Sequence, residues 1–187
     1  QYSGAYVKDP ITGIHDWIVS FDLNSLYPHL IMQYNISPET MIHQPQDFII
    51  TPNAILGEQS EHLTRALKKH TDKNYSVAAN GTCYTREFMG FLPELMAKMY
   101  DDRKTYKKKM IECQKQKEKD PNNKKLDFDI VKYNNFQMVR KIQLNSAYGA
   151  IGNQYFRYYA THMAEAITTS GQLSIRWIAD ELNLFLN

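Results

Sequence analysis

The stretch WIVSFDLNSLYPHLIMQY, residues 17–34, decides which fold the sequence predicts. It opens at residues 17–21 with a short apolar run of mainly aromatic and branched side chains, which predicts a buried strand. The run ends on a single acid, Asp22, and a polar turn that includes Ser25 follows. Pro28 then favours the first turn of a helix, because its fixed φ suits that turn and its missing N–H is not needed there.

The position of Asp22 predicts a ligand site. A carboxylate at the carboxyl end of a strand, where the chain turns into a helix, lies at the edge where open sheets with helices bind ligands. A metal-bound polyphosphate needs such a carboxylate, together with backbone N–H groups that take phosphate oxygens. The alternative is that Asp22 is only a turn or capping residue, and this stretch alone leaves both interpretations open.

The composition is that of an ordinary folded protein. The chain has 187 residues, of which 43% are hydrophobic and 22% charged, enough for one core or for a core with an appendage. No apolar run approaches the roughly 20 residues of a membrane span, so no membrane partner is expected. Cys83 and Cys113 lack the spacing of a zinc site or a disulfide framework, which fits a reducing compartment. We therefore expect a cytoplasmic protein, in the host cytoplasm if the source is a virus. We also expect the chain to be a piece of a longer protein, because both of its ends look cut.

The net charge of +2 is unevenly distributed. Residues 101–125 hold ten Lys or Arg against five acids, so this segment carries +5 and the remainder −3. A local basic helix is a possible footprint for phosphates. The commoner meaning of a charge run is a solvated helix face.

Periodicity and turn residues predict the remaining elements. A short helix is expected within residues 58–70, and a β-hairpin at 76–85, where Asn80-Gly81 favours a two-residue type I′ turn. A long helix should begin at Pro93 and end at a polar tip, and a second should run from Asp127 or Asp129 through Tyr148. Two long helices joined by a short tip should pack antiparallel, and a last helix is expected from residue 161 onward.

The second long helix carries another candidate site. Lys141, Asn145 and Tyr148 are spaced i, i+4 and i+7 and so share one face, and such a polar set is costly to bury for packing alone. Ile142 and Leu144 point away from that face and should take the core. The aromatic residues at 155–159 could stack on bases, but core packing is the favoured interpretation.

Two of these stretches resemble motifs of one enzyme family. The segment DLNSLYP, residues 22–28, resembles the first palm motif of family B DNA polymerases, Asp-x-x-Ser-Leu-Tyr-Pro. The segment KIQLNSAYG, residues 141–149, resembles the fingers motif of that family, Lys-x-x-x-Asn-Ser-x-Tyr-Gly. The motifs stand in the family's order with a basic helix pair between them, and residues 4–7 and 35–40 resemble flanking segments of T4-like bacteriophage members.

The resemblance implies a role for each matching residue in template-directed nucleotidyl transfer to a primer 3′-OH. Asp22 and the Leu23 carbonyl would bind the two Mg²⁺ ions. Tyr27 would select the sugar, and the nascent base pair would pack on Tyr148 and Gly149. The residues that would bind the triphosphate are Ser25, Leu26, Arg103, Lys107, Lys141 and Asn145. The implied partners are primer-template DNA and a dNTP, with a sliding clamp reached through regions outside this chain. Closure of the helix pair would bring the cations onto the phosphates.

The resemblance also shows what this chain lacks. The family's second palm motif, Asp-Thr-Asp, should follow residue 149 and does not occur, while Asp127-Phe128-Asp129 comes too early and is interpreted as a helix cap. His29 replaces the family's usual Ser. Because a two-metal site normally needs a second carboxylate, we expect the isolated chain to be inactive. The alternatives are a non-catalytic basic module that binds nucleic acid, a disabled or split polymerase subunit, and a lysine run that only aids solubility.

The sequence therefore predicts an α+β fold, with a partial palm sheet and a projecting antiparallel two-helix fingers hairpin. The expected divisions are residues 1–92 for the N-terminal part of the palm with its β-hairpin, 93–149 for the fingers helices, and 150–187 for a helical return into the palm.

Overall fold

The computed structural model describes residues 4–42, 50–57 and 60–186. In these residues the chain is α+β, with six helices and one small sheet. The elements in chain order are α1 (Leu26–Tyr34), β1 (Met41–Ile42), α2 (Pro52–Leu56), α3 (Ser60–Thr71), β2 (Tyr75–Val77), β3 (Cys83–Thr85), α4 (Phe91–Lys119), α5 (Lys124–Ile151) and α6 (Thr161–Leu186). Each of the described helices is too short or too polar to cross a lipid bilayer.

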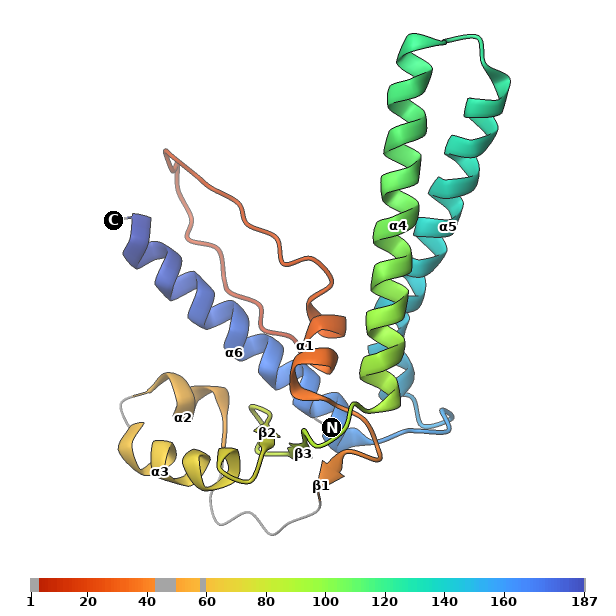
Figure 1. Cartoon of the computed structure of the whole chain (residues 1–187). Coiled ribbons are helices and arrows are strands. Elements are labelled where there is room, and N and C mark those ends of the chain that lie inside the picture. Colours follow the sequence, from red (N-terminus) through yellow and green to blue (C-terminus); the bar gives the residue numbers. More distant parts are fainter. Residues whose placement is uncertain (1–3, 43–49, 58–59, 187) are drawn as a thin grey trace.

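The α4–α5 pair stands away from the rest of the chain (Figure 1). Its bases pack with α1 and the first half of α6 around one core. That core contains aliphatic and aromatic side chains from all four helices and from β3, among them Ile31, Tyr84, Met96, Leu144, Ile151 and Ile167. The predicted antiparallel helix pair and the predicted last helix are confirmed.

The sheet is antiparallel with the order β1-β3-β2, and it confirms the predicted hairpin. The turn differs from the prediction. Val77 pairs with Cys83, and Gly81 N–H donates to the Ala78 carbonyl at 2.8 Å. Of the two expected turn residues only Gly81 has a positive φ, at 82°, which suits a three-residue loop that ends in a left-handed glycine and not a type I′ turn.

The prediction of a buried strand at residues 17–21 is wrong. The described residues 4–24 form neither helix nor strand, and Trp17 is 98% exposed with a φ of 59°. Ile18 and Phe21 are 76% and 60% exposed. A strand is stable only when its backbone groups pair with a neighbour, and β1, β2 and β3 pair only with one another. Apolar composition therefore predicted strand propensity correctly but not strand formation.

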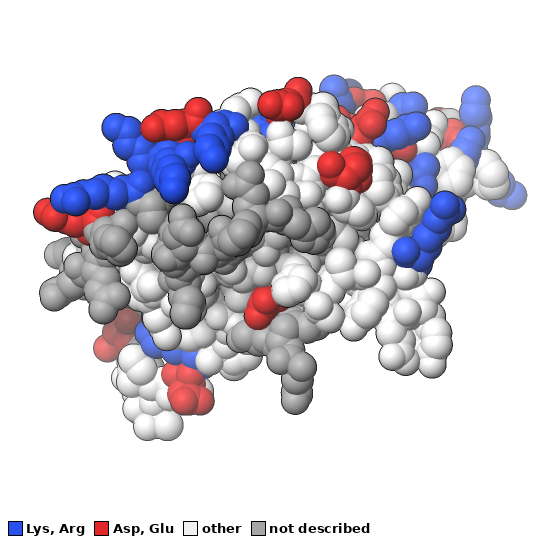
Figure 2. Space-filling view, turned by 90° about the horizontal axis from the view of Figure 1, so that it is seen from below, with Lys and Arg blue, Asp and Glu red and all other residues white. Residues whose placement is uncertain are grey.

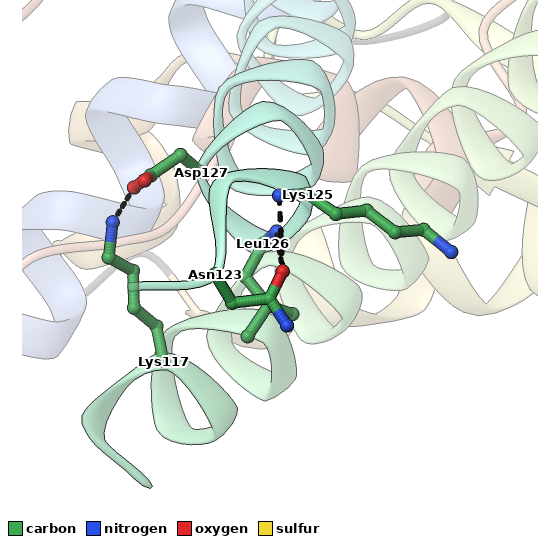
Figure 3. Close-up of polar contacts among 5 residues, drawn as sticks. All are labelled: Lys117, Asn123, Lys125, Leu126 and Asp127. Carbon is green, nitrogen blue, oxygen red and sulfur yellow. Dashed lines mark hydrogen bonds and ion pairs between the residues drawn. The ribbon is translucent and has the colours of Figure 1, made fainter. Parts of the chain in front are cut away.

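The tip of the helix pair is held by a cap and an ion pair, both drawn in Figure 3. Asn123 Oδ1 accepts from the N–H groups of Lys125 and Leu126 at 3.1 and 3.4 Å. Lys117 forms an ion pair with Asp127 across the tip. Asn123 is thus the N-cap of α5, and the prediction that the acids at 127–129 cap this helix is wrong. Asp127 lies within the first turn, where its negative charge interacts favourably with the helix dipole.

The helix predicted within residues 58–70 is α3; Glu58 and Gln59 lie outside the described residues. The basic segment 101–125 falls on α4, the tip and the start of α5. On the underside of the molecule, one group of Lys and Arg lies at the upper left of the view and others lie along the right side (Figure 2).

Candidate nucleotide site

A cavity of about 390 Å³ lies where the start of α1 faces α4 and α5. Its walls combine the turn before α1 with the first turn of that helix and one face of the helix pair. The lining residues are Asp22, Leu23, Asn24, Ser25, Leu26, Tyr27, Pro28, Arg103, Lys141 and Asn145. Residues more than 100 positions apart in the sequence are thereby brought to one place.

The turn that opens α1 is unusual in its backbone. Ser25, the N-cap residue, has a φ of 53° and a ψ of 49°, and its side chain makes no capping bond to the helix. A non-glycine residue in this left-handed region costs about 1 kcal/mol and is retained where its surroundings fix it. The uncapped helix N-terminus carries a partial positive charge and favours an anion.

His29 holds this turn in place. Both its backbone N–H, at 3.1 Å, and its ring Nδ1, at 2.9 Å, bond to the Ser25 carbonyl. The ring also packs edge-on against Tyr100 of α4, with 4.7 Å between centroids. No role was predicted for His29, although its position four residues after Ser25 was a usable signal for this contact.

The helix pair supplies the positive wall of the cavity. Arg103 Nη1 donates to Ser25 Oγ at 3.4 Å, and Arg103 Nε is buried without a hydrogen-bond partner among the described residues. Lys141 and Asn145 approach from α5, and both are exposed. Two of the three residues predicted to share a face of α5 thus line the cavity, and because both are exposed their polar groups carry no burial cost.

An ion pair joins α4 and α5 directly beside the two cations Arg103 and Lys141. Asp102 precedes Arg103 on α4, and Arg140 precedes Lys141 on α5. Arg140 Nε lies 3.2 Å from Asp102 Oδ2. The pair therefore helps to aim Arg103 and Lys141 at the same cavity, although a half-exposed ion pair adds only about 1 kcal/mol or less to stability.

Tyr27 and Tyr148 meet beside the cavity, with their ring centroids 4.8 Å apart. On its other side, Tyr27 lies against α6 at Gly171, where an added Cβ would stand 3.1 Å from Tyr27 Cε1. The small residue on α6 therefore makes room for the Tyr27 ring. Tyr148 is joined to the site through Tyr27 and is absent from the cavity lining.

Other residues of the predicted set lie apart from the cavity. Lys107 is exposed one turn beyond Arg103 and does not line it. A Cβ added at Gly149 would meet nothing within 4 Å, so none of its described neighbours requires a glycine there. The packing predictions fail at three residues, because Ile142 is 58% exposed, Tyr155 89% and Tyr159 45%. Leu144 and Phe156 pack in the core as expected.

The donor set for a metal ion is incomplete. Asp22 is the one carboxylate among the residues that line the cavity, and the described residues contain no cluster of three or more His, Cys, Asp or Glu suited to a metal. Mg²⁺ accepts sites of one or two protein carboxylates completed by water and substrate phosphates. Asp22 and the Leu23 carbonyl fit part of such a site.

Comparison with known proteins agrees with this chemistry. The sequence profile of DNA polymerase family B matches residues 1–184. The chain is 32% identical to the DNA-directed DNA polymerase of Escherichia phage RB69 and 33% identical to that of Enterobacteria phage T4, over the whole of this chain. It is 33% identical to DNA polymerase 1 of Pyrococcus abyssi over 97% of this chain.

The chain therefore belongs to DNA polymerase family B, and the resemblance found in its motifs is confirmed. It covers 24% of each phage protein and 19% of the archaeal one, so it spans about a quarter of the length of its phage relatives.

Proposed function

We propose that this chain is the palm–fingers segment of a DNA-directed DNA polymerase and that the cavity binds the triphosphate of an incoming dNTP. In this scheme α4 and α5 are the fingers, and the turn before α1 is the palm edge. The observation that carries the proposal is the convergence of Asp22, a strained uncapped helix start, Arg103 and Lys141 on one cavity. Membership of family B supports the same assignment.

Each lining residue then has a chemical task. The backbone N–H groups near Ser25 and Leu26 take phosphate oxygens at the positive end of α1. Arg103 and Lys141 neutralise the triphosphate, and Asn145 adds a hydrogen bond. The buried Arg103 Nε, which lacks a partner among the described residues, is a donor that an anion could satisfy.

Asp22 and the Leu23 carbonyl would hold Mg²⁺, and the resemblance implies two such ions in the complete enzyme. When bound, Mg²⁺ supplies charge stabilisation for the attacking and leaving oxygens of the transfer. The second carboxylate of that site would come from the parent protein. Tyr27 and Tyr148 would flank the sugar and the nascent base pair, Gly149 would leave room beside it, and Lys107 would reach the phosphates if the helix pair closes on α1.

The first test compares the parent protein with the isolated 187 residues on a primed template. We expect Mg²⁺-dependent extension of the primer by the full-length protein and none by the isolated chain, because the chain has one of the required carboxylates. Extension by the isolated residues would remove the prediction that a second carboxylate is essential. A full-length protein that binds DNA but never extends a primer would favour the binding module.

Tyr27→Ala tests the assignment of Tyr27 to sugar selection. The ring lies between Tyr148 and α6 and cannot move aside without losing both contacts, so a ribose 2′-OH placed against it would meet a fixed wall. We expect the full-length variant to accept ribonucleotides at least about tenfold more readily, which equals about 1.4 kcal/mol of lost discrimination. Competition between ATP and dATP measures this ratio, with Tyr155→Ala, an exposed tyrosine outside the cavity, as the matched control. An unchanged ratio would remove Tyr27 from this role.

A further inference from the structure

The loop between α1 and β1 binds the first residues of α4, which form the base of that helix. Gly90, the N-cap of α4, has no side chain with which to cap the helix. Three successive N–H groups at this helix start are instead bound by side chains of residues 35–39. Gly90 N–H donates to Asn35 Oδ1 at 2.9 Å, Phe91 N–H to Glu39 Oε1 at 2.6 Å, and Leu92 N–H to Ser37 Oγ at 3.4 Å.

Asn35 is the centre of this joint. It is 8% exposed and ends α1 with a φ of 57°. Besides accepting from Gly90, its Nδ2 donates to the carbonyls of Thr85 at 2.7 Å and Phe88 at 2.8 Å. A single side chain thus ties the end of α1 to the strand and the turn that lead into α4.

The side chains of the α1–β1 loop pack closely against the start of α4. A Cβ at Gly90 would stand 2.5 Å from the Ser37 Cβ and 3.0 Å from the Thr40 Cγ2. The Glu39 carboxylate binds both the Ser37 hydroxyl, at 2.6 Å, and the Phe91 N–H. Slight burial of Glu39 works against its charged form, but hydrogen bonds from the Ser37 hydroxyl and from the backbone N–H groups of Phe91 and Glu39 together hold its pKa below the usual value.

We propose that Asn35 is a positioning residue, which places Arg103 over the turn that opens α1 by fixing α4 to the far end of the same helix. Both helices run from this joint to the cavity: α1 ends at the joint and begins at the cavity, and α4 begins at the joint and brings Arg103 there. At the cavity, the hydrogen bond from Arg103 to Ser25 joins α4 to the start of α1.

A small tilt at the base of α4 becomes a large displacement at Arg103, because Arg103 lies far along the helix. Arg103 lies twelve residues beyond Phe91, about 18 Å along the helix, so a tilt of about 3° at the base moves Arg103 by about 1 Å. A displacement of about 1 Å can cost about 10²-fold in rate when it misplaces a group that acts on the reacting substrate. Because Arg103 is assigned to the triphosphate only under the proposed function, the role of Asn35 rests on that function.

Asn35→Gly in the full-length protein is the direct test, since glycine tolerates the φ of 57° and only the side-chain bonds are lost. We expect KM for the dNTP to rise about tenfold or more, with the Kd for primer-template DNA unchanged. The matched control is Asn80→Gly, which loses contacts to Thr82, His162 and Glu165 but leaves α4 untouched. The control should lower Tm without changing KM.

A double variant separates positioning from general weakening. If Asn35 acts through Arg103, Asn35→Gly should have no further effect on KM in an Arg103→Ala background, whereas independent effects would multiply. Multiplying effects, or a lower Tm with an unchanged KM, would overturn the proposal. If Asn35→Gly does not fold, Glu39→Ala replaces an exposed side chain of the same joint and should show the same non-additivity with a smaller rise in KM. Failure of the wild-type protein to extend a primer would instead count against the proposed function.

Discussion

Asp22→Asn in the full-length protein should abolish primer extension, lowering kcat by at least about 10³-fold, which equals about 4 kcal/mol of transition-state stabilisation. Asp22 is the one carboxylate that lines the cavity, so its replacement leaves that wall without negative charge to hold Mg²⁺. Asparagine keeps the size and the oxygen of the side chain, and the change therefore isolates the charge. Multiple-turnover extension at saturating dNTP measures kcat without a contribution from nucleotide binding.

Two controls make this result specific. Asp16→Asn removes an exposed acid from the same N-terminal segment outside the cavity and should leave kcat unchanged. The Kd of the Asp22→Asn variant for primer-template DNA should stay within about twofold of wild type, because one exposed carboxylate adds little to phosphate affinity. Extension at the wild-type rate by Asp22→Asn would leave the binding-module hypothesis in the stronger position.

The elements that could be predicted from sequence are those with local signals. The two long helices were predicted from Pro93 near the start of α4 and from the polar tip between them, while residues 80–81 marked the hairpin. Local signals placed the ends less well: the start of α5 was set by Asn123, whereas the prediction chose the acids a turn later. The three-residue hairpin loop was likewise decided by strand register and not by the Asn-Gly pair alone.

The features that the sequence analysis missed depend on partners distant in the chain. The run at residues 17–21 has strand composition, but strand formation needs a hydrogen-bonding neighbour, and no described strand pairs with it. The Asn35 joint unites residues more than 50 positions apart, which no local pattern reveals. His29 was within reach, because its partner Ser25 is one helical turn away.

Several residues that the sequence proposes for one site line the same cavity, for a physical reason. Asp22 and Ser25 are neighbours in the chain, and Lys141 and Asn145 are one turn apart on a helix, so each half of the site is a local pattern. Only the meeting of the halves required tertiary structure, and the packing of α1 against α4 and α5 provides it.

Lys141→Ala should lower kcat/KM for dNTP incorporation by about 10²-fold, which equals about 2.7 kcal/mol, mainly through a higher KM. Lys141 lines the cavity together with the strained start of α1, where its ammonium would make a charge-assisted bond to a phosphate oxygen. Steady-state incorporation of one nucleotide by the full-length protein measures the ratio. Lys132→Ala, on the same helix with its ammonium against the Tyr133 ring, is the control that should leave it unchanged.

Lys107→Ala then distinguishes two arrangements of the helix pair. In the described structure Lys107 lies outside the cavity lining, so its loss should change kcat/KM by no more than about threefold, as expected for a screened charge about one helical turn away. A loss as large as that of Lys141→Ala would mean that α4 tilts toward α1 when nucleotide binds and carries Lys107 onto the phosphates. Such a tilt would turn α4 about its base at the Asn35 joint, and the Asn35→Gly substitution, which loosens that base, should then reduce the contribution of Lys107 together with that of Arg103.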